Sequence, residues 1–132
     1  AFANESGGYE IRNRYFKGCI APKDISIRRI RDGPSTECAV FKGFIDYLSA
    51  LTLGILNRTD AITLNSVSNV NKAIPHLRDY ATIHCFLDND VAGKTALAVL
   101  TKRLGTKVID RSTLYSGYND LSEYLTQNLQ TI

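Results

Sequence analysis

Two aspartates follow a strongly apolar segment in the second half of the chain. Residues 82–87 are typical of a buried strand, and Asp88-Asn89-Asp90 ends this run directly before a helix-forming stretch. Two carboxylates so close in sequence repel each other unless a cation lies between them, and hard oxygen ligands suit Mg²⁺ or Mn²⁺. The alternative is that an aspartate only caps the next helix. We expect Asp88 and Asp90 to bind a divalent cation.

A lysine ends a second apolar segment. Residues 38–41 read as a short buried strand, followed by Lys42, Gly43 and, one helical turn later, Asp46. Because the carboxyl ends of parallel strands meet at one edge of a sheet, Lys42 and Asp88 are expected to converge there. A protonated lysine can bind phosphate or take the place of a cation, but it is a poor general base. Asp46 is a candidate ion-pair partner for Lys42.

Secondary-structure patterns divide the chain in two. Residues 1–35 form a basic, β-rich lead-in with strands expected at 9–11, 15–16 and 25–27, and a breaker at 32–35 ends it. In residues 36–132 strands and helices alternate. The expected strands are 38–41, 61–64, 82–87 and 106–109, and the expected helices are 44–56, 69–78, 91–104 and 120–129. This order predicts an α/β fold with a parallel four-stranded sheet flanked by helices.

The composition fits one globular domain. The chain has 132 residues, of which 44% are hydrophobic and 22% charged, and its net charge is only +3. It contains no methionine, so we expect it to be a piece of a longer parent chain. Three cysteines without metal-binding spacing favour a reducing, cytoplasmic location, and no apolar run approaches the roughly 20 residues that span a membrane.

Basic residues concentrate in the lead-in. Tyr15 and Phe16 lie between cationic side chains, where they could stack on bases of a single strand or form one face of an ordinary amphipathic strand. The candidate nucleic-acid-binding residues are Arg12, Arg14, Lys17, Arg28 and Arg29.

Two common nucleotide-binding motifs are absent from the sequence. Gly93-Lys94-Thr95 resembles the end of a P-loop, but Asp88 stands where that motif needs its first glycine. No G-x-G-x-x-G opens a helix, so a nicotinamide cofactor is not expected.

The chain resembles the TOPRIM family, the catalytic domain shared by bacterial primases, topoisomerases and some nucleases. The resemblance rests on the strand followed by Lys42-Gly43-x-x-Asp46, the later Asp88-x-Asp90-x-x-Gly93, and the acidic segment 117–125. It implies a Rossmann-like fold in which the aspartates matched by Asp88 and Asp90 bind magnesium.

In the primase branch, the resemblance implies magnesium-dependent nucleotidyl transfer that builds an RNA primer on single-stranded DNA. The family has a glutamate, acting as general acid or base, where this chain has Lys42. One unit charge pair at about 4 Å and an effective dielectric near 20 is worth roughly 4 kcal/mol, so the exchange matters for cation binding.

Three hypotheses follow. The first is a primase-like catalytic domain whose partners are single-stranded DNA or an RNA–DNA hybrid, nucleotides, and other domains of the parent chain. The second is a catalytically degenerate nucleic-acid-binding or assembly module, in which Lys42 replaces the cation. The third is a response-regulator-like domain, which needs a lysine late in the chain; Lys107 lies inside an expected strand and matches poorly.

Overall fold

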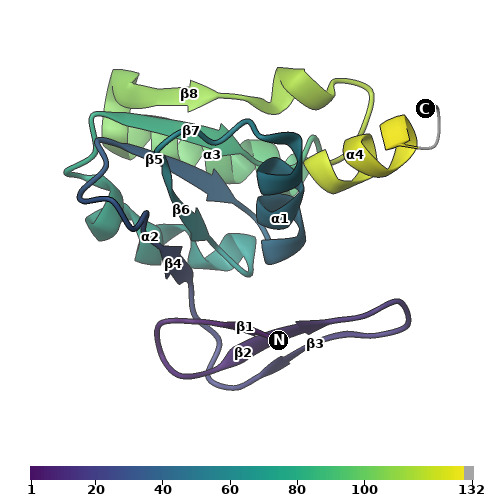
Figure 1. Ribbon diagram of the computed structural model, residues 1–132. Helices are drawn as coiled ribbons and strands as arrows, with labels where there is room; N and C mark the ends of the chain where they lie inside the picture. Colours follow the sequence, from purple (N-terminus) through teal and green to yellow (C-terminus); the bar gives the residue numbers. More distant parts are fainter. Residues whose placement is uncertain (130–132) are drawn as a thin grey trace.

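Two β-sheets make up the framework of the protein (Figure 1). The computed structural model describes residues 1–129. In that part of the chain no helix has the length and apolar character needed to cross a membrane. The smaller sheet has the order β1-β2-β3, and the larger has the order β4-β6-β5-β7-β8.

The larger sheet confirms the α/β prediction. Its strands β5 (Glu37–Phe41), β6 (Asp60–Thr63), β7 (Thr82–Phe86) and β8 (Val108–Asp110) are mutually parallel, as expected. The sequence did not indicate that β4 (Ser26–Arg28) extends this sheet as an antiparallel edge strand on β6. The large sheet therefore begins within the lead-in, and the division at residue 35 stays a prediction.

Helices cover both faces of the large sheet, because successive side chains of a strand point to opposite sides. On one face Cys38 and Val40 pack with α2 (Val70–Leu77) and α3 (Val91–Leu104). On the other face Ala39 and Phe41 pack with α1 (Phe44–Leu53) and α4 (Leu121–Leu129). Central strand β5 is thus buried on both sides, which explains its unbroken apolar sequence.

The small sheet differs in detail from the expected lead-in. It consists of β1 (Phe2–Ala3), β2 (Tyr9–Arg12) and β3 (Lys17–Ile20), all antiparallel. The strand expected at residues 15–16 was wrong, because these residues form the turn of the β2–β3 hairpin. The Asn13 side chain accepts hydrogen bonds from the backbone N–H groups of Tyr15 and Phe16, an Asx turn that competes with strand pairing.

Some helices and strands begin or end at other residues than expected, because the local backbone conformation outweighs the hydrophobic pattern there. Helix α1 stops at Leu53 rather than residue 56, because Gly54 adopts the left-handed conformation with φ 69°. The fourth parallel strand starts late because a 3₁₀ turn, η2 (Gly105–Lys107), precedes it. Similar short turns, η1 (Val67–Asn69) and η3 (Ser112–Tyr115), precede α2 and the final loop.

Gly93 allows α3 to start directly against the end of β7. A Cβ at this position would lie 2.0 Å from the backbone oxygen of Asp88. We expect Gly93→Ala to lower the free energy of unfolding by about 1–3 kcal/mol, since the backbone must shift to relieve the clash. Urea denaturation measures the loss. Gly43→Ala is the matched control, because no atom lies within 4 Å of a Cβ there; equal destabilisation of both variants would contradict the steric explanation.

Candidate functional site

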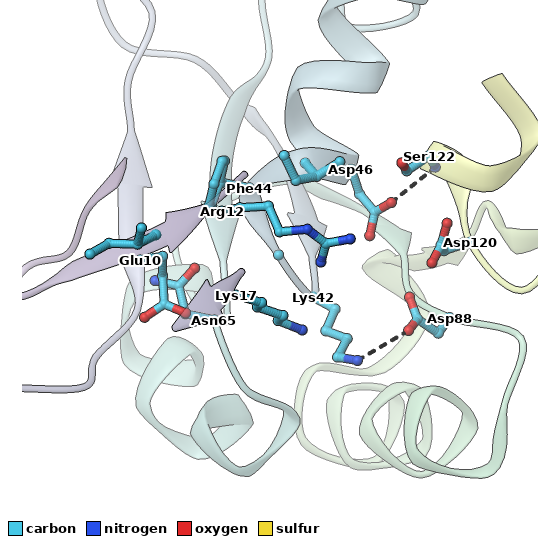
Figure 2. A pocket seen from close by; sticks show the side chains of 13 residues that line it. Glu10, Arg12, Lys17, Lys42, Phe44, Asp46, Asn65, Asp88, Asp120 and Ser122 are labelled. Carbon is cyan, nitrogen blue, oxygen red and sulfur yellow. Dashed lines mark hydrogen bonds and ion pairs between the residues drawn. The ribbon is translucent and has the colours of Figure 1, made fainter. Parts of the chain in front are cut away.

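Three carboxylates converge at the carboxyl edge of the large sheet (Figure 2). Asp46 comes from the first turn of α1, Asp88 follows β7, and Asp120 lies just before α4. One oxygen from each lies within 4.8 Å of the others. Asp46 and Asp88 are buried and Asp120 is half-buried. This convergence depends on parallel pairing, which sets Phe41 opposite Phe86 and so brings the two strand ends together.

Hydrogen bonds between the end of β7 and the loop before α4, residues 115–120, hold Asp120 in this group. The Asn89 backbone N–H donates to the Asn119 carbonyl at 2.6 Å, and the Asn89 side chain donates to the Tyr118 carbonyl at 2.9 Å. The buried Tyr115 hydroxyl donates to the Leu87 carbonyl at 2.6 Å. These contacts fasten the loop to the end of β7. Asn89, the residue between the two sequence-predicted ligands, therefore has a positioning role.

The α1–α4 contact holds Asp46. Asp46 Oδ1 accepts a hydrogen bond from the backbone N–H of Ser122, at the start of α4, at 3.0 Å. Burial, aided by the charge of Asp120, raises the pKa of Asp46 to about 7. Burial also raises the pKa of Asp88, although the Lys42 ammonium acts in the opposite direction. The folded protein thus confines negative charge that a cation would stabilise.

The donor set fits a hard divalent cation. Among residues 1–129, Asp88 Oδ1 is buried and accepts no hydrogen bond, so one oxygen of the cluster lacks a partner. An all-oxygen group with such an orphaned atom suits Mg²⁺ or Mn²⁺. Asp46, Asp88 and Asp120 are the residues that would hold the ion.

Lys42 lies beside the same cluster. Its Nζ is 3.5 Å from Asp88 Oδ2, and 38% of its side chain is exposed. The partner is Asp88 rather than the suggested Asp46, because the Asp46 carboxylate turns toward α4. Glu37 lies at the opposite end of β5 and pairs with His84 at 2.7 Å, so it does not substitute for a glutamate at position 42.

Asp90 has a different environment from Asp88. It is the N-cap of α3, and its Oδ1 accepts a hydrogen bond from the Gly93 N–H at 2.8 Å. It does not belong to the three-carboxylate group found in the described chain. Its role as a metal ligand stays a prediction.

The lead-in sheet faces these acids across a pocket. Arg12 and Lys17, cross-strand neighbours on β2 and β3, line it together with Lys42, Asp46 and Asp88. Figure 2 shows the Arg12 and Lys17 side chains extending toward the acidic side of the pocket. Two of the predicted nucleic-acid-binding residues are therefore brought to the predicted catalytic position.

The other predicted nucleic-acid-binding residues lie outside this pocket. Arg14 lies at the hairpin tip, with its guanidinium 5.6 Å from the centre of the Tyr15 ring. The Arg28 guanidinium donates to the Ala3 carbonyl and lies 4.1 Å from the centre of the Phe2 ring, so it joins β4 to the small sheet. Arg29, the next residue in the chain, is exposed.

Sequence reasoning missed Asp46 and Asp120 as members of the acidic group. Asp46 could have been predicted. It lies one helical turn after Lys42 and Gly43, and a carboxylate in the first turn of a helix that follows a strand lies near the strand's carboxyl end. Asp120 lies in the acidic segment 117–125 that supports the family resemblance, but nothing in that segment marked it as a member of this group. Its approach depends on the loop contacts of Asn89, which are tertiary.

A family model described as Toprim-like matches residues 39–125. The chain belongs to the Toprim-like family. This match covers both strand ends and the acidic tail, and it removes the basis for the response-regulator alternative. Residues 1–21 match a second model, described as a domain of unknown function (DUF8464). No curated protein matches the chain by sequence.

Among solved structures, the fold is similar to the primase fragment of the bacteriophage T7 primase-helicase protein. The TM-score is 0.69 at 16% sequence identity, and the match covers 94% of this chain and 53% of that one. The chain therefore spans about half the length of the matched structure. At this identity the likeness concerns the fold, and it supports the primase-like Toprim architecture.

The raised pKa of Asp46 predicts a pH-dependent stability. The folded state binds this proton more tightly than the unfolded chain, so the contribution of Asp46 to stability is present near pH 4 and is lost as the pH rises to about 7. We expect Asp46→Asn, whose amide oxygen can still accept from Ser122, to lose less stability over this range. The difference should be on the order of 2–3 kcal/mol by urea unfolding at about pH 5 and about pH 8 in EDTA.

The exposed Asp79 provides the control for this measurement. Asp79→Asn should retain the wild-type pH dependence. An Asp46→Asn protein with the same pH dependence as the wild type would show that Asp46 does not carry this proton.

Proposed function

We propose that this chain is the Toprim part of a primase-like protein and takes part in magnesium-dependent nucleotidyl transfer, building RNA primers on single-stranded DNA. One observation carries the proposal. Asp46, Asp88 and Asp120 bring oxygens within 4.8 Å of one another in a pocket whose other wall contains Arg12 and Lys17. Carboxylates suit a divalent cation, and the cationic wall suits the phosphates that such a cation binds.

Each side of the pocket has a distinct part in this mechanism. The three aspartates hold Mg²⁺ or Mn²⁺, with Asp90 a further candidate ligand, and the bound ion would supply charge stabilisation to the reacting phosphate. Arg12 and Lys17 bind and orient phosphate oxygens from the opposite wall. Lys42, which lies where the family has its acid–base glutamate, donates a proton or a hydrogen bond to phosphate rather than accepting a proton.

The β2–β3 hairpin is the proposed path of the nucleic acid. Arg14 and Tyr15 form its tip, and the Tyr15 ring is 87% exposed. An exposed aromatic ring beside a guanidinium is a stacking platform for bases of single-stranded DNA or the end of an RNA–DNA hybrid. From there the strand would reach Arg12 and Lys17 in the pocket.

The proposed setting is a longer cytoplasmic protein. Residues 36–132 would form its catalytic unit and residues 1–35 its nucleic-acid-binding lead-in, with nucleotides and other domains of the parent chain as partners. The three cysteines are all free, which is consistent with a reducing compartment.

The Lys42–Asp88 contact favours a second candidate function. An ammonium 3.5 Å from Asp88 supplies part of the positive charge that a metal ion would bring. In this alternative the acidic group is neutralised internally, and the chain is a catalytically degenerate binding or assembly module.

A Mn²⁺ titration by calorimetry separates the two functions. If the metal site is intact, we expect the wild-type chain to bind Mn²⁺, Asp88→Asn to lose the binding heat, and Lys42→Glu to bind more tightly. The increase should reach about tenfold or more, since the substitution changes the charge beside the ion by two units and a gain of about 1.4 kcal/mol already gives tenfold. Circular dichroism verifies that each variant is folded.

Wild-type binding that Asp88→Asn leaves unchanged would remove the acidic group from the mechanism. Binding that appears only in Lys42→Glu would establish that the lysine has displaced the metal, and would select the binding module. With binding present, primer synthesis by the parent protein carrying Asp88→Asn is the activity test, and loss of synthesis is the expected result.

Phosphate binding by the hairpin predicts a salt-dependent affinity. We expect Arg12→Gln and Lys17→Gln each to weaken binding of labelled single-stranded DNA and to reduce the salt slope by about one. Fluorescence anisotropy over a salt series measures both effects. Lys102→Gln is the matched control, because this exposed lysine lies in the last turn of α3, outside the pocket. A loss as large in Lys102→Gln would indicate non-specific charge attraction.

A further inference from the structure

Glu10 is a further carboxylate in the lining of the same pocket, and it does not belong to the group of Asp46, Asp88 and Asp120. It precedes Arg12 by two residues on β2, and its cross-strand neighbour is Cys19, as Lys17 is that of Arg12. Side chains two residues apart on a strand, and those directly opposite them, share one face of a sheet. Glu10, Arg12 and Lys17 all line the pocket, and Figure 2 shows them on the lead-in side.

One oxygen of this carboxylate lacks a partner. Glu10 is only 6% exposed. Its Oε1 pairs with the Lys23 ammonium at 2.7 Å, whereas within residues 1–129 its Oε2 is buried and accepts no hydrogen bond. A hydrogen bond from the Cys19 thiol to Glu10 raises the thiol pKa, but a thiol is a weak donor and leaves the carboxylate without a strong one on this side.

A buried carboxylate oxygen without a donor is costly, and its presence in a ligand pocket indicates that the ligand supplies the donor. Charge decides which kind of donor fits. Lys23 already neutralises Glu10, and Arg12 and Lys17 add positive charge on the same face. A second cation would meet repulsion there, so a neutral hydroxyl is the better partner. The terminal torsion of a glutamate is broad, so a small rotation presents Oε2 to the pocket.

Spacing along β2 narrows the ligand class. Glu10 and Arg12 are two residues apart, or about 7 Å along a strand. A ligand that fills both positions carries an anion and a hydroxyl at about this separation, as a nucleotide carries its phosphate and its ribose hydroxyls. We propose that Glu10 accepts a hydrogen bond from a ribose 2′-hydroxyl while Arg12 and Lys17 hold the phosphate, so that the pocket selects ribonucleotide over deoxyribonucleotide units. The inference rests on the proposed nucleic-acid function of this pocket.

The test compares short labelled oligoriboadenylate and oligodeoxyadenylate of equal length by fluorescence anisotropy at low salt. We expect the wild-type chain to bind the RNA more tightly, by about tenfold, the value of one hydrogen bond to a charged group. In Glu10→Met, which keeps the length of the side chain but removes both acceptor oxygens, the ratio of the two affinities should approach one. The ratio is the readout because removing a negative charge shifts binding of both oligonucleotides alike.

Lys23→Gln is the matched control. It breaks the same ion pair and removes a charge of opposite sign, but it leaves the Glu10 carboxylate in place, so the RNA preference should persist. Thermal melting verifies that both variants are folded.

Equal binding of RNA and DNA by the wild type, or an RNA preference that Glu10→Met retains, would overturn the assignment of Glu10 while leaving the proposed nucleic-acid function standing. Failure of the wild type to bind either oligonucleotide at low salt would overturn both.

Discussion

Parallel pairing of β5 with β7 is the constraint on which the site depends. The register sets Phe41 opposite Phe86, so Lys42, one residue beyond β5, and Asp88, two residues beyond β7, lie at the same edge of the sheet. Only short connections follow the two strands: α1 begins at Phe44 and brings Asp46 to that edge, and α3 begins at Val91. Helix α3 can begin this close to the end of β7 because Gly93 has no Cβ to collide with the Asp88 backbone. A one-residue slip would move these side chains to opposite faces of the sheet.

Electrostatics then shapes what this edge can do. Burial disfavours the charged forms of Asp46 and Asp88, and repulsion among the three carboxylates adds to this, so the pKa of both groups is raised. Positive charge from two parts of the chain offsets the negative charge of these carboxylates. Lys42 comes from the sheet itself and contacts Asp88 directly, whereas Arg12 and Lys17 come from the lead-in hairpin and remain across the pocket. The pocket therefore joins an acidic wall to a basic wall, an arrangement suited to a phosphate group and its cation.

Short-range patterns predicted much of the fold. The four parallel strands and four helices were each placed within a few residues, because buried strands such as β5 are continuous apolar runs and helices carry recognisable ends. The errors arose where a local hydrogen bond overrode the pattern. Asn13 turned Tyr15 and Phe16 into a hairpin tip, and Gly54 ended α1 early. Strand β4 was also expected in the lead-in, but its pairing with β6 joins residues far apart in sequence.

By itself the sequence determined the α/β class, the membership of Asp88 and Lys42 in one strand-end site, and the basic character of the lead-in, since each follows from residue type and local spacing. Only the tertiary structure decided which groups share the site. It added Asp46 and Asp120 through the contacts of Ser122 and Asn89, and it placed Glu10 in the lining of the pocket. The physical reason is that these choices depend on loop docking and on the packing of one sheet against another, which no short stretch of sequence encodes.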